Sequence, residues 1–267
     1  MKTFFAVIFL IVCVSSPSVA ANNSLSDEQL LQIKFDQKLD SQVSPDLCFR
    51  DETGKQIRLG DYFGKRPVVL MLGYYGCPML CTLVLNGATE SFRGLKWSVG
   101  DQFDVIFASI DPDETPPLAA EKKKNYLRRY GHRGKPNGWH FLTGGSNSIQ
   151  KLANEIGFRF AYDPALKQFA HPSGFVVLTP EGKVAHYFFG VTYSAAELNS
   201  ALRNASVKKI GSPVEQLILL CCEYSPLRGK YGYVIMDAVR VGGIAMVLGL
   251  GVIIFRQQNR RKPEKPR

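Results

Sequence analysis

Two cysteines four residues apart, directly after an apolar run, constrain the fold of this chain more than any other feature. Residues 68–73 have the length and composition of a buried strand, and Cys77 and Cys81 follow within the segment Gly-Cys-Pro-Met-Leu-Cys. This order predicts a strand, a short loop and the start of a helix. Because residues four apart share one face of a helix, both sulfur atoms are expected to point at one metal ion or at each other. The pair is therefore either a clamp for a soft metal ion or a redox switch.

Strand-like and helix-like segments alternate along the middle of the chain. Further apolar runs of strand length lie at residues 103–110, 158–162, 174–178 and 184–189. Helical patterns follow Cys77, Thr115, Ser146 and Ser194. The sequence Thr-Pro-Glu-Gly at 179–182 predicts a turn that joins the last two runs into a hairpin. We expect an α/β domain, and the element order, with a cysteine pair at the first helix start, is that of a thioredoxin-like fold.

Residues that begin and end helices support this assignment. Thr115 precedes Pro116 as an N-cap residue precedes the first turn of a helix. Gly157 is expected to end the helix that runs to residue 156. Ser194 and Glu197 form the pattern of a capping box at the start of the last helix.

The cysteine pair has the chemistry that both metal binding and disulfide exchange require. The amides and the partial positive charge at a helix N-terminus are expected to lower the pKa of the Cys77 thiol, which favours the thiolate. The spacing is C-x3-C, which differs from the C-x2-C of ordinary thioredoxin-like reductants. The plainer alternative is an inert disulfide, or two cysteines that pack as small apolar side chains.

His171 precedes the first strand of the predicted hairpin, in a loop that lies beside the cysteine turn in a thioredoxin-like fold. A single histidine is most often a hydrogen-bonded surface or core group, so its position alone leaves its role open. Two thiolates and one imidazole suit Cu(I), and with added oxygen or water ligands they hold Cu(II). A Cys2His zinc site with an open position is chemically possible as well.

The two ends of the chain have the patterns of targeting and anchoring segments. Residues 1–20 combine Met-Lys, an apolar run and small residues, as a cleavable secretory signal does. Residues 233–255 form an apolar stretch of about the length that crosses a bilayer, so we expect a transmembrane helix there. Asp237 and Arg240 lie in its first half, where an ion pair near the interface would make them tolerable.

The basic residues after the apolar stretch predict which side of the membrane each segment occupies. Residues 256–267 are rich in Arg and Lys, so this tail should be cytoplasmic. The domain at 45–206 is then periplasmic at the inner membrane, between an N-terminal arm at 21–44 and a juxtamembrane connector at 207–232. Since the tail carries much of the formal net charge of +10, the charge does not call for a nucleic-acid partner.

Several short motifs occur in order across most of residues 45–205. They are Gly-Tyr-Tyr-Gly-Cys-Pro-Met-Leu-Cys at 73–81, Val-Leu-Asn-Gly at 84–87, Ser-Ile-Asp-Pro at 109–112, Trp-His-Phe-Leu-Thr-Gly at 139–144 and the His171 loop before Val-Val-Leu at 176–178. Together they resemble the SCO/SenC family, and the predicted C-terminal anchor resembles a bacterial subgroup of it. The resemblance implies a membrane-tethered, thioredoxin-like protein that binds copper and helps to metallate the binuclear copper site of cytochrome c oxidase.

The same resemblance assigns roles to individual residues. It implies that Cys77, Cys81 and His171 are the copper ligands. It also places an acidic residue of the family pattern at Asp111, where it would assist copper transfer as a neighbour of the ligands. The alternative for Asp111 is a plain turn that leads into a capped helix.

Three functions compete for this site. A copper chaperone would pass copper by ligand exchange to the oxidase subunit with the binuclear site, in concert with other copper chaperones, and needs no catalysis. A thiol-disulfide oxidoreductase would instead reduce the acceptor's cysteines, with Cys77 as nucleophile and Cys81 as resolving cysteine. A thiol peroxidase is disfavoured because Tyr74 stands where the threonine before the attacking cysteine is needed.

Other cysteines and histidines have no assigned chemistry. These are Cys48, Cys221, Cys222, His132, His140 and His186. We expect a buried structural role for Cys221 and Cys222, with a bridge from one of them to Cys48, a bridge to another chain or a second copper site as alternatives. The three histidines are expected to be solvated or structural groups.

Overall fold

The computed structural model describes residues 25–131 and 134–211. The predicted signal at 1–20, the predicted membrane segment at 233–255 and both Cys221 and Cys222 lie outside the described residues, as does His132. Within the described ranges, no helix combines the length and apolarity that crossing a membrane requires.

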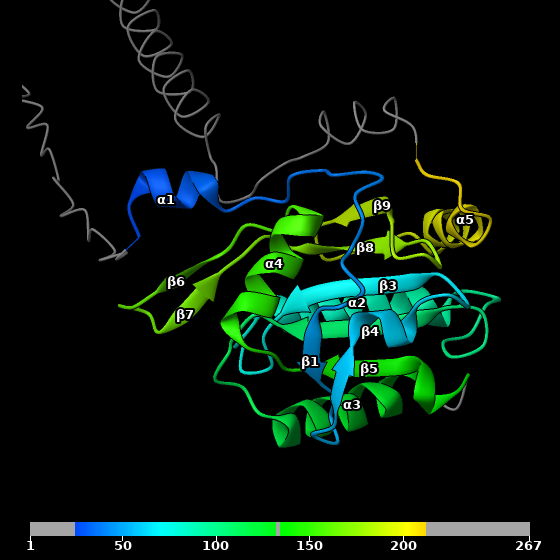
Figure 1. Ribbon diagram of the computed structural model, residues 1–267, viewed down its shortest axis with the longest axis horizontal. Coiled ribbons are helices and arrows are strands. Elements are labelled where there is room, and N and C mark those ends of the chain that lie inside the picture. The colour runs from blue at the N-terminus through cyan, green and yellow to red at the C-terminus, as the bar shows by residue number, and fades with distance from the viewer. Residues whose placement is uncertain (1–24, 132–133, 212–267) are drawn as a thin grey trace, which may run out of the picture. The chain divides into compact units, whose positions relative to one another are not determined.

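A five-stranded sheet carries the site (Figure 1). β3 (Val68–Gly73) pairs in parallel with β4 (Asp104–Ser109), which pairs in parallel with β5 (Trp139–Leu142). On its other side β3 pairs antiparallel with β8 (Gly174–Leu178), and β8 pairs antiparallel with β9 (Val184–Phe189). The order is therefore β5-β4-β3-β8-β9. Every residue of β3 and β4 is buried, as continuous apolar runs in a sheet covered on both faces should be.

Three helices form one layer against this sheet. α2 (Leu80–Arg93) contacts both α3 (Pro116–Tyr130) and α5 (Ala195–Ser206). α3 also packs on β5, and α5 packs on β8 and β9. This arrangement follows from right-handed connections between the parallel strands, which place α2 and α3 on the same face.

The fourth long helix, α4 (Ser146–Ile156), lies on the opposite face. Two neighbouring residues of β9 show this. The Tyr187 hydroxyl donates to the carbonyl of Ile156 at 2.9 Å, whereas His186 Nε2 lies 3.4 Å from the Glu197 carboxylate of α5. Since successive side chains of a strand point to opposite faces, α4 and α5 cover different sides of the sheet.

The predicted helix boundaries are confirmed at three of these helices. α3 begins at Pro116 after Thr115, although the Thr115 side chain makes no capping bond. Gly157 ends α4 with a left-handed φ of 74°, the conformation that favours glycine. The Ser194 hydroxyl accepts the amide of Glu197 at the start of α5.

Two short hairpins lie outside the main sheet. β1 (Cys48–Arg50) pairs with β2 (Gln56–Arg58), and β6 (Ala161–Asp163) pairs with β7 (Gln168–Ala170). The β6–β7 hairpin leads directly to His171 and projects from the body in Figure 1. Short 3-10 turns at Leu59–Tyr62 and Pro136–Gly138 complete the fold.

The predicted strand at 158–162 is correct only in part. Gly157 turns the chain out of α4, and Phe158 then makes a single antiparallel bridge to Phe35, so the regular strand starts only at Ala161. The ring of Phe158 is buried in edge contact with that of Phe35, 5.2 Å between centroids. The apolar pattern therefore reports burial of this segment correctly, but not its pairing.

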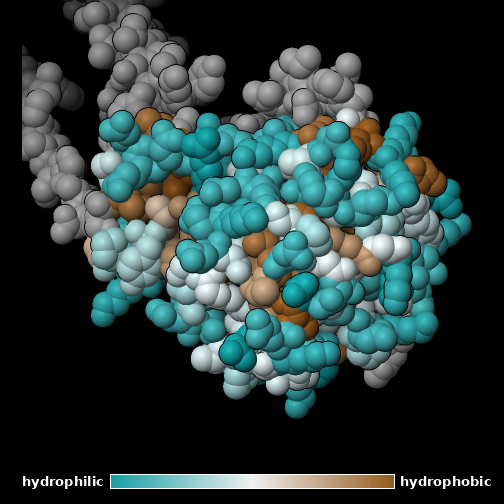
Figure 2. Space-filling view, in the orientation of Figure 1, coloured by the Kyte–Doolittle hydropathy of each residue, from teal (hydrophilic) through white to brown (hydrophobic). Residues whose placement is uncertain are grey.

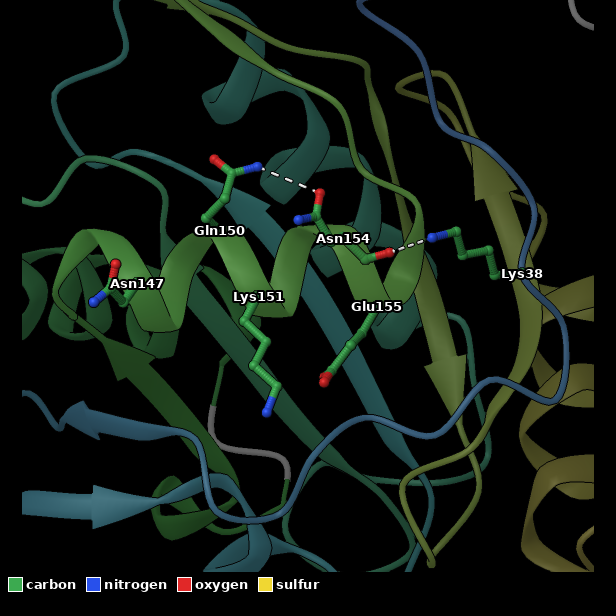
Figure 3. A pocket seen from close by; sticks show the side chains of 6 residues that line it. All are labelled: Lys38, Asn147, Gln150, Lys151, Asn154 and Glu155. Atoms are coloured by element: carbon green, nitrogen blue, oxygen red, sulfur yellow. Dashed lines mark hydrogen bonds between the residues drawn. The ribbon is translucent and has the colours of Figure 1, made fainter.

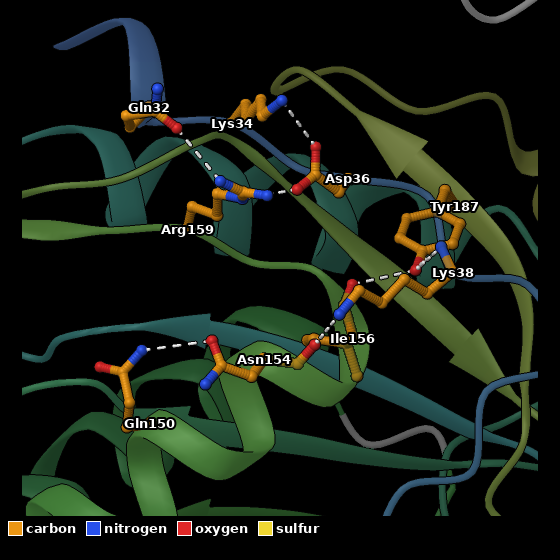
Figure 4. Close-up of polar contacts among 9 residues, drawn as sticks. All are labelled: Gln32, Lys34, Asp36, Lys38, Gln150, Asn154, Ile156, Arg159 and Tyr187. Carbon is orange, nitrogen blue, oxygen red and sulfur yellow. Dashed lines mark hydrogen bonds and ion pairs between the residues drawn. The ribbon is translucent and has the colours of Figure 1, made fainter. Parts of the chain in front are cut away.

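The N-terminal arm is a short helix followed by a packed segment. α1 (Asp27–Gln32) has a capping box at Ser26, and residues 33–44, the N-terminal strap, then cross the end of α4 (Figure 4). Asp36 accepts from Arg159 at 2.5 Å, and the Lys38 amide donates to the hydroxyl of a tyrosine in β9 at 2.8 Å. The strap is thus part of the folded domain.

A hollow of about 650 Å³ lies on the exposed side of α4 (Figure 3). It is lined by Lys38, Asn147, Gln150, Lys151, Asn154 and Glu155. All six are polar, and Lys38 Nζ donates to the Asn154 carbonyl at 2.6 Å. None of the predicted site residues lines this hollow. Hydrophilic side chains also cover most of the surface in this view of the described residues (Figure 2).

Candidate metal centre

The loop after β3 brings the two cysteines together. The helix was predicted to begin directly after Cys77, but α2 begins at Leu80, so Cys77 lies in the loop and Cys81 in the first helical turn. The Cys77 amide donates to the Tyr74 carbonyl at 3.3 Å, which turns the loop back. The Cys77 sulfur then accepts the Cys81 amide at 3.3 Å, so a cysteine sulfur takes the place of a helix cap.

His171 reaches the same point from the loop between β7 and β8. Its Nε2 lies 3.0 Å from the Cys81 sulfur, and its Nδ1 lies 2.9 Å from the Pro172 carbonyl oxygen. Because a carbonyl only accepts, Nδ1 carries the proton and Nε2 presents its lone pair toward the thiol. This is how a metal-binding histidine is usually oriented.

The ligand atoms of Cys77, Cys81 and His171 all lie within 4.8 Å of one another, and all three residues are buried. Two atoms held 2.0–2.3 Å from one ion are at most about 4.6 Å apart, so metal binding needs very little rearrangement. Within the part of the chain that the structure describes, this is the one group of three or more His, Cys, Asp or Glu side chains with such an arrangement. The donor set, two soft sulfurs and an imidazole, fits a soft metal ion.

The two thiols differ in acidity. The hydrogen bond from the Cys81 thiol, then the contact with His171 and the amides of Cys81 and Met79, lower the pKa of Cys77 to about 3 against the opposing effect of burial. Burial, followed by the neighbouring Cys77, raises the pKa of Cys81 above its ordinary value. The pair thus holds one thiolate and one thiol, and a metal ion that binds both sulfurs displaces the second proton.

Aromatic rings enclose the site. Phe158 stacks on the His171 ring with centroids 5.8 Å apart, and Tyr74 meets the same ring edge-on at 6.0 Å. Tyr74 also packs on Phe169 of β7 at 5.6 Å, and its amide donates to the Cys81 sulfur at 3.4 Å. Burial, then the charge of Cys77, raises the pKa of the Tyr74 phenol, which therefore stays neutral. These rings limit the access of water to the sulfurs.

Asp111 makes a turn bond, and its role in copper transfer stays a prediction. Its carboxylate accepts the Asp113 amide at 2.9 Å. Glu114, three residues later, was not foreseen from the sequence. Its carboxylate accepts the amides of Tyr75 and Gly76 at 2.8 and 2.6 Å, immediately before Cys77.

Among the described residues, one further cysteine and two further histidines lie apart from the centre. Cys48 is exposed and free. His140 is structural as predicted: its ring lies 4.0 Å from that of Tyr62, and burial lowers its pKa to about 3. His186 faces α5, where it lies beside Glu197.

Gly73 leaves no room for a side chain beside the thiols. A Cβ there would lie 2.9 Å from the Cys81 sulfur and 2.9 Å from a ring carbon of Phe107. We expect Gly73→Ala to displace the sulfur, to cost about 1–3 kcal/mol of folding free energy and to weaken metal binding. Thermal unfolding and metal titration check this, with Gly145→Ala, where a Cβ meets nothing within 4 Å, as the control. Equal behaviour of the two variants would contradict the steric argument.

Comparisons with known proteins give one family. The SCO1/SenC family model matches residues 36–206. A protein of Aquifex aeolicus VF5, described as a candidate electron transfer protein, has 29% identity and a TM-score of 0.56, covering 64% of this chain and 95% of that one. BsSco, described as a member of the Sco family of cytochrome c oxidase assembly proteins, has 23% identity and a TM-score of 0.50, covering 65% of this chain and 99% of that one.

A curated relative extends the comparison. A candidate copper-binding protein of Stutzerimonas stutzeri is 24% identical over 121 residues, which are 43% of this chain and 54% of the relative. The chain thus spans about half the length of the curated relative it matches.

The sheet order and the Cys2His group define a thioredoxin-like protein with a soft-metal centre at the start of α2. Since the family model covers more than half of the chain, the protein belongs to the SCO1/SenC family. The predicted family and thioredoxin-like fold are confirmed. The donor set and the copper-binding relative support copper as the metal. The C-terminal anchor of the subgroup stays a prediction.

Proposed function

We propose that this protein is a copper chaperone that holds copper with the thiolates of Cys77 and Cys81 and with His171 Nε2, and delivers it to the binuclear copper site of cytochrome c oxidase. The observation that carries the proposal is the convergence of these three buried donors within 4.8 Å. Membership of a family that includes a Sco protein of oxidase assembly supports the choice of acceptor.

Each side chain has a distinct part in this function. Cys77, with its lowered pKa, offers a thiolate without waiting for a proton to leave, so it is the first donor to meet copper or an incoming acceptor thiolate. His171 is already oriented through its Nδ1 bond to Pro172. Cys81 is the most deeply buried of the three and gives up its proton only when copper binds. Stepwise replacement of these donors by those of an acceptor transfers the copper without a free ion.

The second candidate function is thiol-disulfide exchange, which the lowered pKa of Cys77 favours. The Cys77 thiolate would attack a disulfide of the acceptor, the acceptor's leaving thiolate would take up a proton, and Cys81 would then resolve the mixed disulfide. The protein ends with a Cys77–Cys81 disulfide and the acceptor with two thiols. This reaction would prepare the acceptor's cysteines for copper.

The proposed location is the inner membrane, with the copper-binding domain in the periplasm and the tail in the cytoplasm. It rests on the signal-like residues 1–20, the apolar stretch 233–255 and the basic tail 256–267. An anchor would confine donor and acceptor to one surface and so raise their effective concentration.

Copper stoichiometry of the full-length chain, reduced and kept free of air, tests the proposed function. We expect one tightly held copper per wild-type chain and none in Cys77→Ser/Cys81→Ser. Cys48→Ser is the matched control, because Cys48 is a free cysteine outside the centre, and it should retain the wild-type copper content. If the reduced wild type does not hold copper, the proposed chaperone function is wrong, and thiol-disulfide exchange becomes the leading candidate.

A further inference from the structure

Two charged side chains hold the loop that carries Cys77 into the metal centre. Glu114 accepts the Tyr75 amide at 2.8 Å with Oε2 and the Gly76 amide at 2.6 Å with Oε1. Lys122 of α3 donates from Nζ to the Tyr75 carbonyl at 2.8 Å. The N–H and the C=O of Tyr75 are thus bound by groups of opposite charge. We call Glu114 and Lys122 the loop clamp.

The carboxylate of the clamp is itself fixed in place. The buried Ser109 hydroxyl donates to Glu114 Oε2 at 2.6 Å, and the Asp111 amide donates to the Ser109 hydroxyl at 3.0 Å. Hydrogen bonds between backbone amides and an ionised carboxylate are about twice as strong as neutral ones. The clamp therefore ties the loop after β3 firmly to the loop after β4.

The backbone at Cys77 lies outside the helix. α2 starts only at Leu80, and Met79 at its N-cap position makes no side-chain capping bond. The hydrogen bond from the Cys77 amide to the Tyr74 carbonyl is 3.3 Å long, longer than the three bonds of the clamp, and the Cys77 sulfur accepts the Cys81 amide at 3.3 Å, an ordinary distance for sulfur. Gly76, the last clamped residue, has no side chain that packing could hold. The clamp at the preceding residue therefore acts together with the hydrogen bonds of the Cys77 sulfur in positioning that sulfur.

We propose that Glu114 and Lys122 are positioning residues for the metal centre, which fix the Cys77 sulfur relative to Cys81 and His171 and so set how slowly copper leaves. They act through the backbone of Tyr75 and Gly76, not as ligands. The inference rests on the proposed function, because it takes copper to be the ion that these three groups hold.

The test compares clamp variants with matched variants of α3. Glu114→Ala and Lys122→Met remove the clamp, whereas Glu121→Ala and Lys124→Met make the same changes at exposed positions of α3. Full-length protein is loaded with Cu(I), and the rate at which the chelator bathocuproine disulfonate removes it is measured. We expect release about tenfold faster in both clamp variants, as for other residues that orient metal ligands, and no change in the controls.

A copper-free measurement provides the second readout. In the apoprotein, glutathione disulfide oxidises the Cys77–Cys81 pair to a disulfide and is reduced to two glutathione thiols. The equilibrium reports how well the two sulfurs are held together, so a loosened loop should shift it severalfold toward the dithiol. A general loss of stability would not move this equilibrium while the far-UV circular dichroism stays that of the folded protein.

The two measurements show separately whether the positioning role of the loop clamp or the proposed copper function is wrong. If both clamp variants release copper at the rate of their controls and reach the same equilibrium with glutathione, the positioning role of Glu114 and Lys122 is wrong. If the wild type holds no copper, the proposed function fails, and the glutathione equilibrium alone decides on the clamp. If Glu114→Ala does not fold, Lys122→Met carries the test, because it removes one donor at the surface of α3 and leaves the carboxylate in place.

Discussion

His171→Ala is expected to lose tight copper binding and to keep an exchangeable cysteine pair. The imidazole is the one nitrogen donor of the centre, and its Nε2 lies 3.0 Å from the Cys81 sulfur with the lone pair already directed at the site. Mutation of a residue that only orients a metal ligand lowers metal affinity by about 10–100-fold. Loss of the ligand itself should therefore lower copper affinity by at least about a hundredfold. Competition with a Cu(I) chelator of known affinity measures this loss.

The same variant separates the two candidate functions. A bond between the Cys77 and Cys81 sulfurs needs no imidazole, so the exchange rate with a disulfide probe should stay within about an order of magnitude of the wild type. His186→Ala is the matched control, because this histidine lies on β9 beside Glu197 of α5. Wild-type copper affinity in His171→Ala would remove His171 from the ligand set. Equal losses in both histidine variants would point to a general defect of folding.

The sheet was predictable wherever burial alone determines the sequence pattern. β3, β8 and β9 are entirely or largely buried, and their runs of Val, Leu and Phe have strand length. β5 was missed as a strand because only four residues, Trp139–Leu142, form it directly after a Pro-Asn-Gly turn. Such a short run has no periodicity of its own, and its pairing with β4 is a long-range property.

The three residues of the centre were predictable, and the groups that support them were not. Cys77 and Cys81 follow a strand at short spacing, whereas His171 was singled out through the family resemblance, and the structure brings all three together. Glu114 acts through hydrogen bonds to backbone amides of a distant loop. A backbone amide is present at almost every residue, so such a contact leaves no pattern in the sequence. The helix start at Leu80 was missed for a related reason, since a cysteine sulfur accepts the amide that an ordinary cap would take.

Chemical modification of Cys77 should be nearly independent of pH between about 5 and 8. The neighbouring Cys81 thiol and His171 hold the pKa of Cys77 at about 3, so its thiolate is already formed throughout this range, while the raised pKa of Cys81 keeps that thiol protonated. An ordinary thiol has a pKa of about 8.5, and its thiolate fraction rises roughly several hundredfold over the same interval.

The experiment uses iodoacetamide on the apoprotein with Cys13, Cys48, Cys221 and Cys222 replaced by serine, and the same protein unfolded in urea is the control. Between about pH 5 and 8, the reaction rate of the folded protein should change less than about twofold. The rate in urea should rise nearly tenfold per pH unit until the pH reaches the ordinary pKa of a thiol. Adding Cys81→Ala removes the first hydrogen bond to the thiolate and should restore part of the pH dependence. A folded wild-type centre that follows the urea profile would mean an ordinary thiol at Cys77. Cys77 would then have to lose a proton before it could bind copper or attack an acceptor disulfide. The loop would not raise the thiolate fraction of Cys77 for either function.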